Sequence, residues 1–574
     1  DGGDVLPTHV EFNNTGTSRV LDMDGTSDLS NHATHVAGTL IGGGANSSAL
    51  GMAFDAELHA YDWDNDFSEV ADAAANGLLV SNHSYGYITG WNYNSTDEQW
   101  TWFGDSFVSE EEDYRFGFYS FESFLIDDIA YNAPYYLYVK SAGNDRGDWD
   151  GSSTIHPPDG GDEGFDCIGG QGNAKNVLTV GAIQDIPNGY SSVSDVVEAS
   201  FSSMGPSDDG RIKPDIVGNG TGVFSSLATG DSDYDSYWGT SMAAPNVAGS
   251  LILLQEYYED LYGEYMRSST LKALVIATAD ESGPNPGPDY KFGWGVLNTA
   301  KAATAITNNN VSTQILEENY SASAQTFTFT ASGEEPITAT LVWTDLPGDV
   351  PGISLDPTDA ALVNNLNLSV ASDGSTFLPY KLSASNPSAA ATTGVNNVDN
   401  VEKVVIQNPT PGQEYTIEVS HAGFIQGGSQ TYSLILTGLN SSSSDLRISN
   451  IYGLHQSGQA GGQLSPRYYA QVINSGGVVS EEVMVGLEAG GVNPGFANAE
   501  LASIFPTDTA YALVSGYHPQ NLGMNEITIS LPDDDFNNNN SGALTQETTE
   551  GTYSYANNEP PNAGAVGFGG GEGA

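Results

Sequence analysis

The hydrophobic pattern of the chain changes character near residue 308, and this change limits the folds that it can adopt. Before that point, short apolar runs alternate with stretches of helical spacing. The apolar runs include residues 58–61, 78–81, 136–139 and 177–180, and the helical stretches include residues 70–76 and 121–131. Near-continuous apolar strands that alternate with helices predict an α/β fold, in which helices cover both faces of a parallel sheet. In such sheets the functional residues gather where the strands end.

After residue 308 the helical spacing disappears, and alternating strands with turn residues between them take over. These strands are expected at residues 326–329, 339–343, 366–370, 415–419 and 432–436. The pattern predicts a β-sandwich or jelly roll over residues 308–440. A polyserine run at 441–444 is expected to be a linker, and a second β-sandwich is expected over 445–542. The predicted order is therefore one α/β domain (1–307), two all-β domains and a truncated or disordered tail (543–574).

The charge balance excludes one class of partner. The chain of 574 residues carries 15 Lys and Arg against 73 Asp and Glu, a net charge of −58. Nucleic acid would be repelled by such a surface. The acidic residues fit a protein kept soluble in salt water, and carboxylates are also the ligands that calcium prefers.

The only cysteine, Cys167, excludes an internal disulfide bond. It precedes an apolar run, so we expect a buried thiol in the core. No apolar run is long enough to span a membrane, and no leader sequence is visible. The chain begins at Asp1 without a preceding strand and ends in a glycine-rich run at 569–574, so we expect it to be truncated at both ends.

The candidate nucleophile is Ser241, in the string Gly-Thr-Ser-Met-Ala-Ala-Pro-Asn-Val-Ala-Gly at 239–249. Small residues surround it, and a run predicted to form a buried helix follows at 247–254 and continues to Tyr258. The start of a helix exposes the hydroxyl and favours developing negative charge. A helix-capping serine is the common alternative. The whole string resembles the nucleophile motif of the subtilisin-like serine peptidases (subtilases).

The candidate base is His32, in Asn-His-Ala-Thr-His-Val-Ala-Gly-Thr at 31–39. This string resembles the histidine motif of the subtilases, which implies that the first histidine is catalytic. The small residues of the predicted helix let it pack closely against the sheet. His35 is expected to be a packed or capping residue. The two histidines together also suggest a metal site, but no third ligand is in register with them.

The carboxylate expected to orient His32 is Asp1, because Asp1-Gly2-Gly3 resembles the Asp-x-Gly motif of the subtilases. Its separation of 31 positions from His32 also suits the family. Asp22 and Asp24 are rivals, but they lie in a segment that reads as a turn.

Asn144 follows the apolar run that ends at residue 139, and the resemblance implies that its amide stabilises the oxyanion together with the N–H of Ser241. A plain turn residue is the alternative. The order Asp, His, Asn, Ser matches the subtilases, and no Gly-x-Ser-x-Gly string surrounds Ser241, which counts against an α/β-hydrolase. Further similar strings lie at 176–182, 201–206, 210–216 and 293–295; Asn246 departs from the family, which usually has His there.

Two segments are expected to bind substrate by the same resemblance. Ser84, Tyr85 and Gly86 resemble the strand that pairs with an extended substrate backbone, with Tyr85 adding apolar surface. A further set of residues is expected to form a wall of the primary specificity pocket, namely Ser141, Ala142 and Gly143. An ordinary strand end is the alternative for the first segment.

The later domains carry weaker resemblances. Residues 341–345, 362–368 and 396–402 resemble the C-terminal jelly roll of alkaline bacterial subtilases, and this implies a structural calcium ion, for which the sequence names no ligands. Asp62, Asp64 and Asp66 are possible ligands, although solvated loop carboxylates are the more common case. Residues 445–448 and 472–476 resemble CARDB-type adhesion modules, which imply spacing or surface attachment.

Together these features predict a secreted or cell-surface serine endopeptidase that acts on proteins or peptides through an Asp-His-Ser triad, with no cofactor for the chemistry. A catalytically inactive subtilase scaffold that serves in adhesion is one alternative, and an esterase with the same triad is another. The acidic composition predicts that activity and stability hold at high salt.

Overall fold

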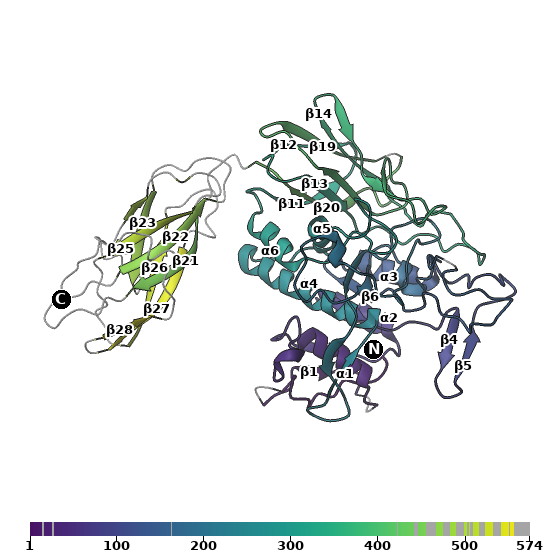
Figure 1. Cartoon of the computed structure of the whole chain (residues 1–574). Helices are drawn as coiled ribbons and strands as arrows, with labels where there is room; N and C mark the ends of the chain where they lie inside the picture. Colours follow the sequence, from purple (N-terminus) through teal and green to yellow (C-terminus); the bar gives the residue numbers. More distant parts are fainter. Residues whose placement is uncertain are drawn as a thin grey trace.

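The computed structural model describes residues 1–440 apart from 14–15, 26–27, 162 and 422, and a set of separate segments after residue 445 (Figure 1). Those segments are 446–454, 467–474, 483–489, 499–501, 504, 509–515, 523–531, 541–549 and 552–555. The predicted linker (441–444), the Asp- and Asn-rich run (533–540) and the glycine-rich end (569–574) lie outside the described residues.

A four-stranded parallel sheet forms the centre of the first domain, in the order β3 (Val80–His83), β6 (Leu137–Ser141), β7 (Leu178–Ile183) and β8 (Ile216–Asn219). Val80 pairs with Leu137, and Val180 pairs with Ile216. Every residue of β6 and β7 is buried, as expected of strands covered on both faces.

Helices cover both faces of this sheet, as predicted (Figure 1). Because strand side chains alternate, Leu137 and Val139 pack with α4 (Thr240–Tyr262) and α5 (Ser268–Thr278). Tyr136 and Tyr138 point the other way, into a cluster with α2 (Asp66–Ala75) and α3 (Phe121–Asn132). The helix α6 (Thr299–Thr307) packs against α4 and α5. The α/β prediction is therefore confirmed.

A second parallel sheet is smaller and separate. It pairs β1 (Val20–Asp22) with β2 (Leu58–Ala60), and α1 (Asn31–Ile41) lies beside it. A cavity of about 650 Å³ is lined by residues of β2 and β3, and Asp1 borders it as well. The two sheets do not join across this cavity, and α1 packs against α4 and β9 (Val223–Ser226).

The predicted close packing of α1 occurs against β9 rather than against the central sheet. A Cβ atom on Gly38 would lie 2.3 Å from the hydroxyls of both Ser225 and Ser226. Those hydroxyls donate to the carbonyls of His35 and Thr34 in α1, at 2.8 and 2.9 Å. Only glycine allows the strand to approach the helix this closely.

The region after residue 308 is an antiparallel sandwich. One sheet runs in the order β11 (Gln314–Tyr320), β20 (Gln430–Thr437), β13 (Ile337–Val342) and β18 (Val401–Ile406), and the other in the order β12 (Gln325–Thr330), β19 (Glu414–His421), β14 (Leu366–Ser372) and β15 (Ser375–Phe377). Trp343, Leu366 and Ile417 are fully buried between the sheets. The outer face of β13 and β20 packs on α5.

The strands after residue 445 are also antiparallel. One sheet holds β21 (Leu446–Leu454), β22 (Arg467–Asn474) and β25 (Thr509–Ser515). The other holds β24 (Ala499–Leu501), β23 (Val483–Ala489), β26 (Gly523–Ser530), β27 (Ser541–Thr549) and β28 (Thr552–Tyr555). Strands β27 and β28 extend this sheet past residue 542, which corrects the predicted tail from residue 543. Their polar composition gives no apolar alternation that would have revealed them.

The remaining described strands are short hairpins, namely β4 (Trp91–Asn94) with β5 (Gln99–Trp102), β9 with β10 (Tyr234–Tyr237), and β16 (Tyr380–Lys381) with β17 (Thr392–Thr393). Cys167 is fully buried and unpaired, as expected. Within the described part of the chain, none of the helices is long and apolar enough to cross a membrane.

Candidate active site

Ser241 is the second residue of α4, and its side chain lies in the first turn of that helix. Gly239, directly before the helix, has a φ of 152°, a conformation that a residue with a side chain rarely adopts. The helix then buries a long apolar face against β3, β6, β7 and β8, including Val247, Leu251 and Leu254. The serine is thus held at the N-terminal end of a core helix, where the helix dipole favours negative charge.

The Ser241 hydroxyl is hydrogen-bonded to the end of β3. Its Oγ donates to the carbonyl of Ser84 at 3.1 Å, and Ser84 Oγ donates to the carbonyl of Ser241 at 2.9 Å. Ser241 is 9% exposed. These two bonds join the nucleophile segment to one of the two segments that are expected to bind substrate.

His32 lies in the first turn of α1, and Ser30 caps this helix by accepting the N–H of Ala33 at 3.2 Å. The imidazole Nδ1 lies 2.9 Å from Oδ2 of Asp1 and 3.1 Å from Oδ1. A carboxylate facing Nδ1 favours the tautomer with the proton on Nδ1, which leaves Nε2 free to accept one. Asp1 Oδ1 also accepts the N–H of Gly2 at 2.7 Å.

The surroundings of His32 favour a neutral ring. Burial lowers the pKa of His32 below its usual value. A neutral imidazole is the form that can act as a base.

The rival residues do not lie in this arrangement. Asp22 ends β1, and its Oδ1 accepts the N–H groups of Asp24 and Gly25 at 3.2 and 2.8 Å, which makes the predicted turn. His35 is fully buried: its Nε2 donates to the carbonyl of Val223 at 2.9 Å, and its ring stacks on Tyr237. His35 therefore holds α1 to the β9–β10 hairpin.

Asn144 lies three residues beyond the end of β6, exposed beside the start of α4. Its Oδ1 accepts the N–H of Thr240 at 2.8 Å and the Thr240 hydroxyl at 3.0 Å. These two bonds orient the amide, so that its NH₂ group is the part left to act as a donor. Asn144 Nδ2 would lie 3.4 Å from a Cβ atom built on Gly239, two residues before Ser241.

The loop around Asn144 is held by Ser203, for which the sequence predicts no role. Ser203 Oγ accepts the N–H of Asp145 at 3.1 Å and lies 3.2 Å from Asp145 Oδ2. Gly143, with a φ of 113°, accepts the N–H of Ser203 through its carbonyl at 3.0 Å. Burial raises the pKa of Asp145 to about 6. A serine in a loop 58 positions away carries no local signal that could have revealed this role.

Tyr85, in the segment predicted to bind substrate, is half-buried and lines the same cavity as Asp1 and β2. Its hydroxyl donates to Asp66 Oδ2 at 3.1 Å and contacts His83 Nδ1 at 2.8 Å. Its carbonyl accepts a hydrogen bond from the ammonium of Lys140. Ser84 is buried, whereas Gly86 is exposed.

Lys140 was missed because it interrupts the apolar run of a buried strand. Its side chain is buried, and it donates to Ser141 Oγ at 3.1 Å as well as to Tyr85. Burial lowers the pKa of Lys140 to about 8. Lys140 thus ties the end of β6 to the segment 84–86 that follows β3.

The expected pocket wall is mostly covered. Ser141 and Ala142 are buried, and Ser141 Oγ donates to the carbonyl of His83 at 3.2 Å. Gly143 is half-exposed. Only the last of the three therefore reaches the surface as the structure stands.

The three acidic residues considered as calcium ligands make local bonds. Asp62 Oδ1 accepts the N–H of Asp64 at 2.7 Å, and Asp66 accepts the Tyr85 hydroxyl. They form no cluster of three metal-binding groups within the described part of the chain.

Comparison with known proteins identifies the family of the first domain. A model of the subtilase family matches residues 6–295, half of the chain, so that His32, Asn144 and Ser241 lie inside the match and Asp1 outside it. The serine protease/ABC transporter B family protein tagD of Dictyostelium discoideum is 25% identical over 556 residues, which cover 71% of this chain and 29% of that protein. A C5a peptidase of Streptococcus pyogenes is 38% identical over 112 residues, which cover 18% of this chain and 9% of that protein.

Among solved structures, the prenylagaramide maturation protease PagA is 20% identical, with a TM-score of 0.37, over 53% of this chain and 90% of that one. The patellamide maturation protease PatA is 18% identical, with a TM-score of 0.37, over 54% of this chain and 95% of that one. The match to this chain spans less than a third of the length of the two curated relatives, tagD and the C5a peptidase. The match of the family model over half of its residues shows that this chain belongs to the subtilase family.

Proposed function

We propose that this chain is a serine endopeptidase in which Ser241 is the nucleophile, His32 the base, Asp1 the group that orients His32, and Asn144 an oxyanion donor. The observation that carries the proposal is the Asp1–His32 hydrogen bond on α1, together with a serine in the first turn of α4, where the neighbouring Thr240 anchors Asn144. Membership of the subtilase family supports the assignment.

In the proposed reaction, His32 Nε2 takes the proton of Ser241 as Oγ attacks the scissile carbonyl carbon. The negative charge that forms on the carbonyl oxygen is stabilised by Asn144 Nδ2 and the N–H of Ser241. His32 then gives the proton to the leaving amine as the peptide bond breaks and an acyl-enzyme forms. A water molecule, deprotonated by His32, hydrolyses this ester, and the proton returns to Ser241.

The hydrogen bond from Ser241 to the Ser84 carbonyl has a consequence for this reaction. The hydroxyl must turn from that carbonyl toward His32 before the proton can move, because a base acts only within hydrogen-bond reach. A substrate backbone that pairs with the segment 84–86 would compete for the same carbonyl and release the hydroxyl. Since Lys140 occupies the carbonyl of Tyr85, the exposed backbone of Gly86 is the other group proposed to pair with the substrate.

The proposal is tested by hydrolysis of an unfolded protein and of a short peptide, with and without a serine-directed fluorophosphonate. Cleavage that the inhibitor abolishes is expected, and cleavage that survives in a folded Ser241→Ala variant would overturn the proposal. A matched ester substrate separates the esterase alternative: ester hydrolysis without any peptide hydrolysis would favour it.

One observation favours a second candidate, an inactive subtilase scaffold that serves in adhesion. The hydroxyl of Ser241 donates to the carbonyl of Ser84, not to His32. A protein that binds cell surfaces or polysaccharide, but neither hydrolyses peptides nor reacts with a fluorophosphonate, would support this candidate.

We also propose that the protein is secreted or attached to a cell surface, with the sandwich at 308–440 acting as a jelly-roll module and the strands after residue 445 as a CARDB-like spacer. The net charge of −58 and the absence of any possible internal disulfide bond are compatible with a salt-exposed protein stabilised by packing and ions. Fractionation of the source cells tests the location, and recovery of the protein only in the cytosol would contradict it.

A further inference from the structure

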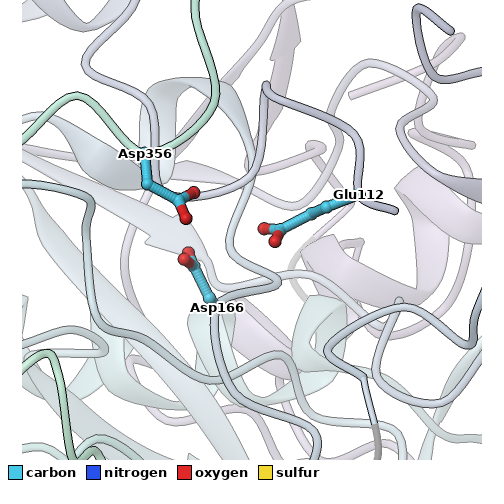
Figure 2. A group of neighbouring side chains, drawn as sticks. All are labelled: Glu112, Asp166 and Asp356. Carbon is cyan, nitrogen blue, oxygen red and sulfur yellow. The ribbon is translucent and has the colours of Figure 1, made fainter. Parts of the chain in front are cut away.

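Three carboxylates from distant parts of the chain converge at the boundary between the peptidase domain and the sandwich (Figure 2). They belong to Glu112, Asp166 and Asp356, and each offers an oxygen that lies within 4.8 Å of the others. Glu112 and Asp166 are half-buried loop residues of the first domain. Asp356 is exposed and belongs to the loop between β13 and β14 of the sandwich.

A fourth carboxylate, Asp208, is independent evidence that this place is built for a ligand. Asp208 is only 8% exposed, and neither of its carboxylate oxygens has a hydrogen-bond partner among the described residues. Its direction follows from Gly117: a Cβ atom there would lie 2.0 Å from Asp208 Oδ1 and 2.5 Å from Asp166 Oδ1. Both oxygens therefore lie beside the same point, which places the Asp208 carboxylate next to that of Asp166, at the edge of the cluster.

The other buried oxygens of the cluster are unpaired in the same way. Oε1 of Glu112 and Oδ1 of Asp166 are buried and have no hydrogen-bond partner in the described part of the chain. Buried polar atoms are almost always hydrogen-bonded, because leaving them unpaired costs free energy. Four such oxygens together, all of them acceptors, indicate that a donor or a cation completes the site.

The nearby basic side chains do not neutralise these carboxylates. Arg115, three residues after Glu112, pairs with Asp113 at 2.5 Å. Arg211, three residues after Asp208, pairs with Asp209 at 2.8 Å. The repulsion among the four carboxylates is therefore not offset by these cations, although buried like charges are strongly unfavourable.

The backbone around the cluster is fixed in place. The N–H of Asp208 donates to the carbonyl of Gly117 at 3.0 Å, and the N–H of Asp166 donates to the carbonyl of Gly205 at 2.9 Å. The N–H of Gly117 donates to the carbonyl of Ile168 at 2.9 Å. The loops therefore cannot relieve the repulsion simply by moving apart, and they present the carboxylates in a set arrangement.

We propose that Glu112, Asp166, Asp208 and Asp356 bind a calcium ion that clamps the sandwich to the peptidase domain. All four ligands are hard oxygen donors, with neither histidine nor cysteine among them, which favours calcium or magnesium over zinc. Four carboxylates from irregular loops offer up to eight oxygens, the coordination number that calcium accepts and magnesium does not. The exposed side of Asp356 leaves room for water ligands and for entry of the ion.

The clamp would act on a loop that already contacts the first domain at two other points. The N–H of Gly348 donates to the hydroxyl of Tyr119 at 3.1 Å, and the N–H of Ala361 donates to Asp209 Oδ2 at 3.0 Å. Asp356 lies between these anchors. Calcium is therefore expected to order residues 349–360 and to raise the stability of the two domains together, because an ion that binds only the native state stabilises it.

The test uses the whole chain carrying Ser241→Ala, so that self-cleavage cannot obscure the result. The proteins compared are this parent, Asp208→Asn and Asp166→Asn. Each is first treated with EDTA. Its thermal unfolding is then measured with and without added Ca²⁺ or Mg²⁺, and its binding of each ion is measured by isothermal titration calorimetry. The parent is expected to bind calcium and to unfold several degrees higher with it. Each Asn variant is expected to unfold no lower than the parent in EDTA, since a repulsive charge is gone, but to lose most of the rise with calcium.

The matched control is Asp359→Asn, which removes the same charge from an exposed position of the same loop and should keep the full rise. Hydrogen exchange of residues 349–360 should slow with calcium in the parent and in this control, but not in Asp208→Asn. The proposal is overturned if calcium leaves the parent unchanged, if Asp208→Asn keeps the full rise, or if magnesium stabilises the parent and calcium does not.

Discussion

The two halves of the candidate site are built very differently. Ser241 stands at the start of α4, a helix whose buried face packs on the central sheet. Asn144 follows β6, one of the two fully buried strands of the central sheet. His32 and Asp1 stand on α1 and the N-terminal segment, next to the separate two-stranded sheet of β1 and β2. A cavity that Asp1 itself borders lies between this unit and β3.

Because of this difference, the two halves of the site should respond differently to substitutions. Ser241 is positioned by packing over the whole length of a core helix, so a local substitution near it should leave its place unchanged. His32 depends on the packing of α1 against α4 and β9 and on one hydrogen bond to Asp1. We therefore expect the chemistry to need both halves, but the stability of the arrangement to depend on the second.

The largest expected effect comes from the core half. Ser241→Ala should abolish peptide hydrolysis, because no other group can form the acyl-enzyme; in subtilisin, loss of the nucleophile lowers kcat about 10⁶-fold. Steady-state kinetics together with a melting curve measure this. The melting temperature should stay near that of the parent, and a variant that is unfolded would show instead that the serine is needed for structure.

Asp1→Asn should cause the next largest loss of peptide hydrolysis. If it causes none, the half of the site that carries His32 does not depend on Asp1. Without the carboxylate, the imidazole loses its orientation and its preferred tautomer; in subtilisin, loss of the orienting Asp alone costs about 3 × 10⁴ in kcat. The matched control is Asp22→Asn, which changes a turn residue at the end of β1. If Asp22→Asn were inactive and Asp1→Asn active, the assignment of the pair would be wrong.

Asn144→Ala should lower kcat with little change in KM, because its amide is proposed to act on charge that exists only in the transition state. Loss of the equivalent donor in subtilisin costs about 10²–10³-fold. Kinetics with one peptide substrate give both constants. An increase in KM alone would mean that Asn144 binds substrate and does not stabilise the oxyanion.

The smallest expected effect concerns stability and pH in the half that carries α1. Burial lowers the pKa of His35 to about 4 from about 6.5, so the unfolded chain takes up a proton between these values that the native protein does not. The free energy of unfolding should therefore fall as the pH drops from 6.5 to 4, by roughly 3 kcal/mol from this residue. Denaturant titrations of the parent and His35→Gln at pH 7 and 5 measure it, and equal pH slopes would contradict it.

The sequence predicted the α/β domain and the positions of its strands because the local pattern carries that information. The alternation of Leu137 and Val139 with Tyr136 and Tyr138, for example, follows directly from a strand covered on both faces. The candidate nucleophile could be named for a similar reason, since Ser241 lies within a string of family-like residues that departs from the family at Asn246.

What the sequence did not predict depends on contacts between distant segments. The direction of Tyr85 is set by Asp66 together with the nearby His83, and the role of Lys140 is set by the carbonyl of Tyr85. Asp66 and Lys140 become neighbours of Tyr85 only in the folded chain. The carboxylate cluster joins Glu112 to Asp356 across both domains, so no spacing in the sequence could have indicated it. The polar strand β27 was missed because it has no apolar alternation.

The most direct measurement of the central claim is labelling of the whole chain with a fluorophosphonate, followed by peptide mass mapping. One label per chain on Ser241, with parallel loss of peptide hydrolysis, is the predicted result. The label should disappear in Ser241→Ala and be greatly slowed in Asp1→Asn, because the serine reacts only when His32 is held as its base. Hydrolysis that continues while Ser241 remains unlabelled, or labelling at another residue, would contradict the account.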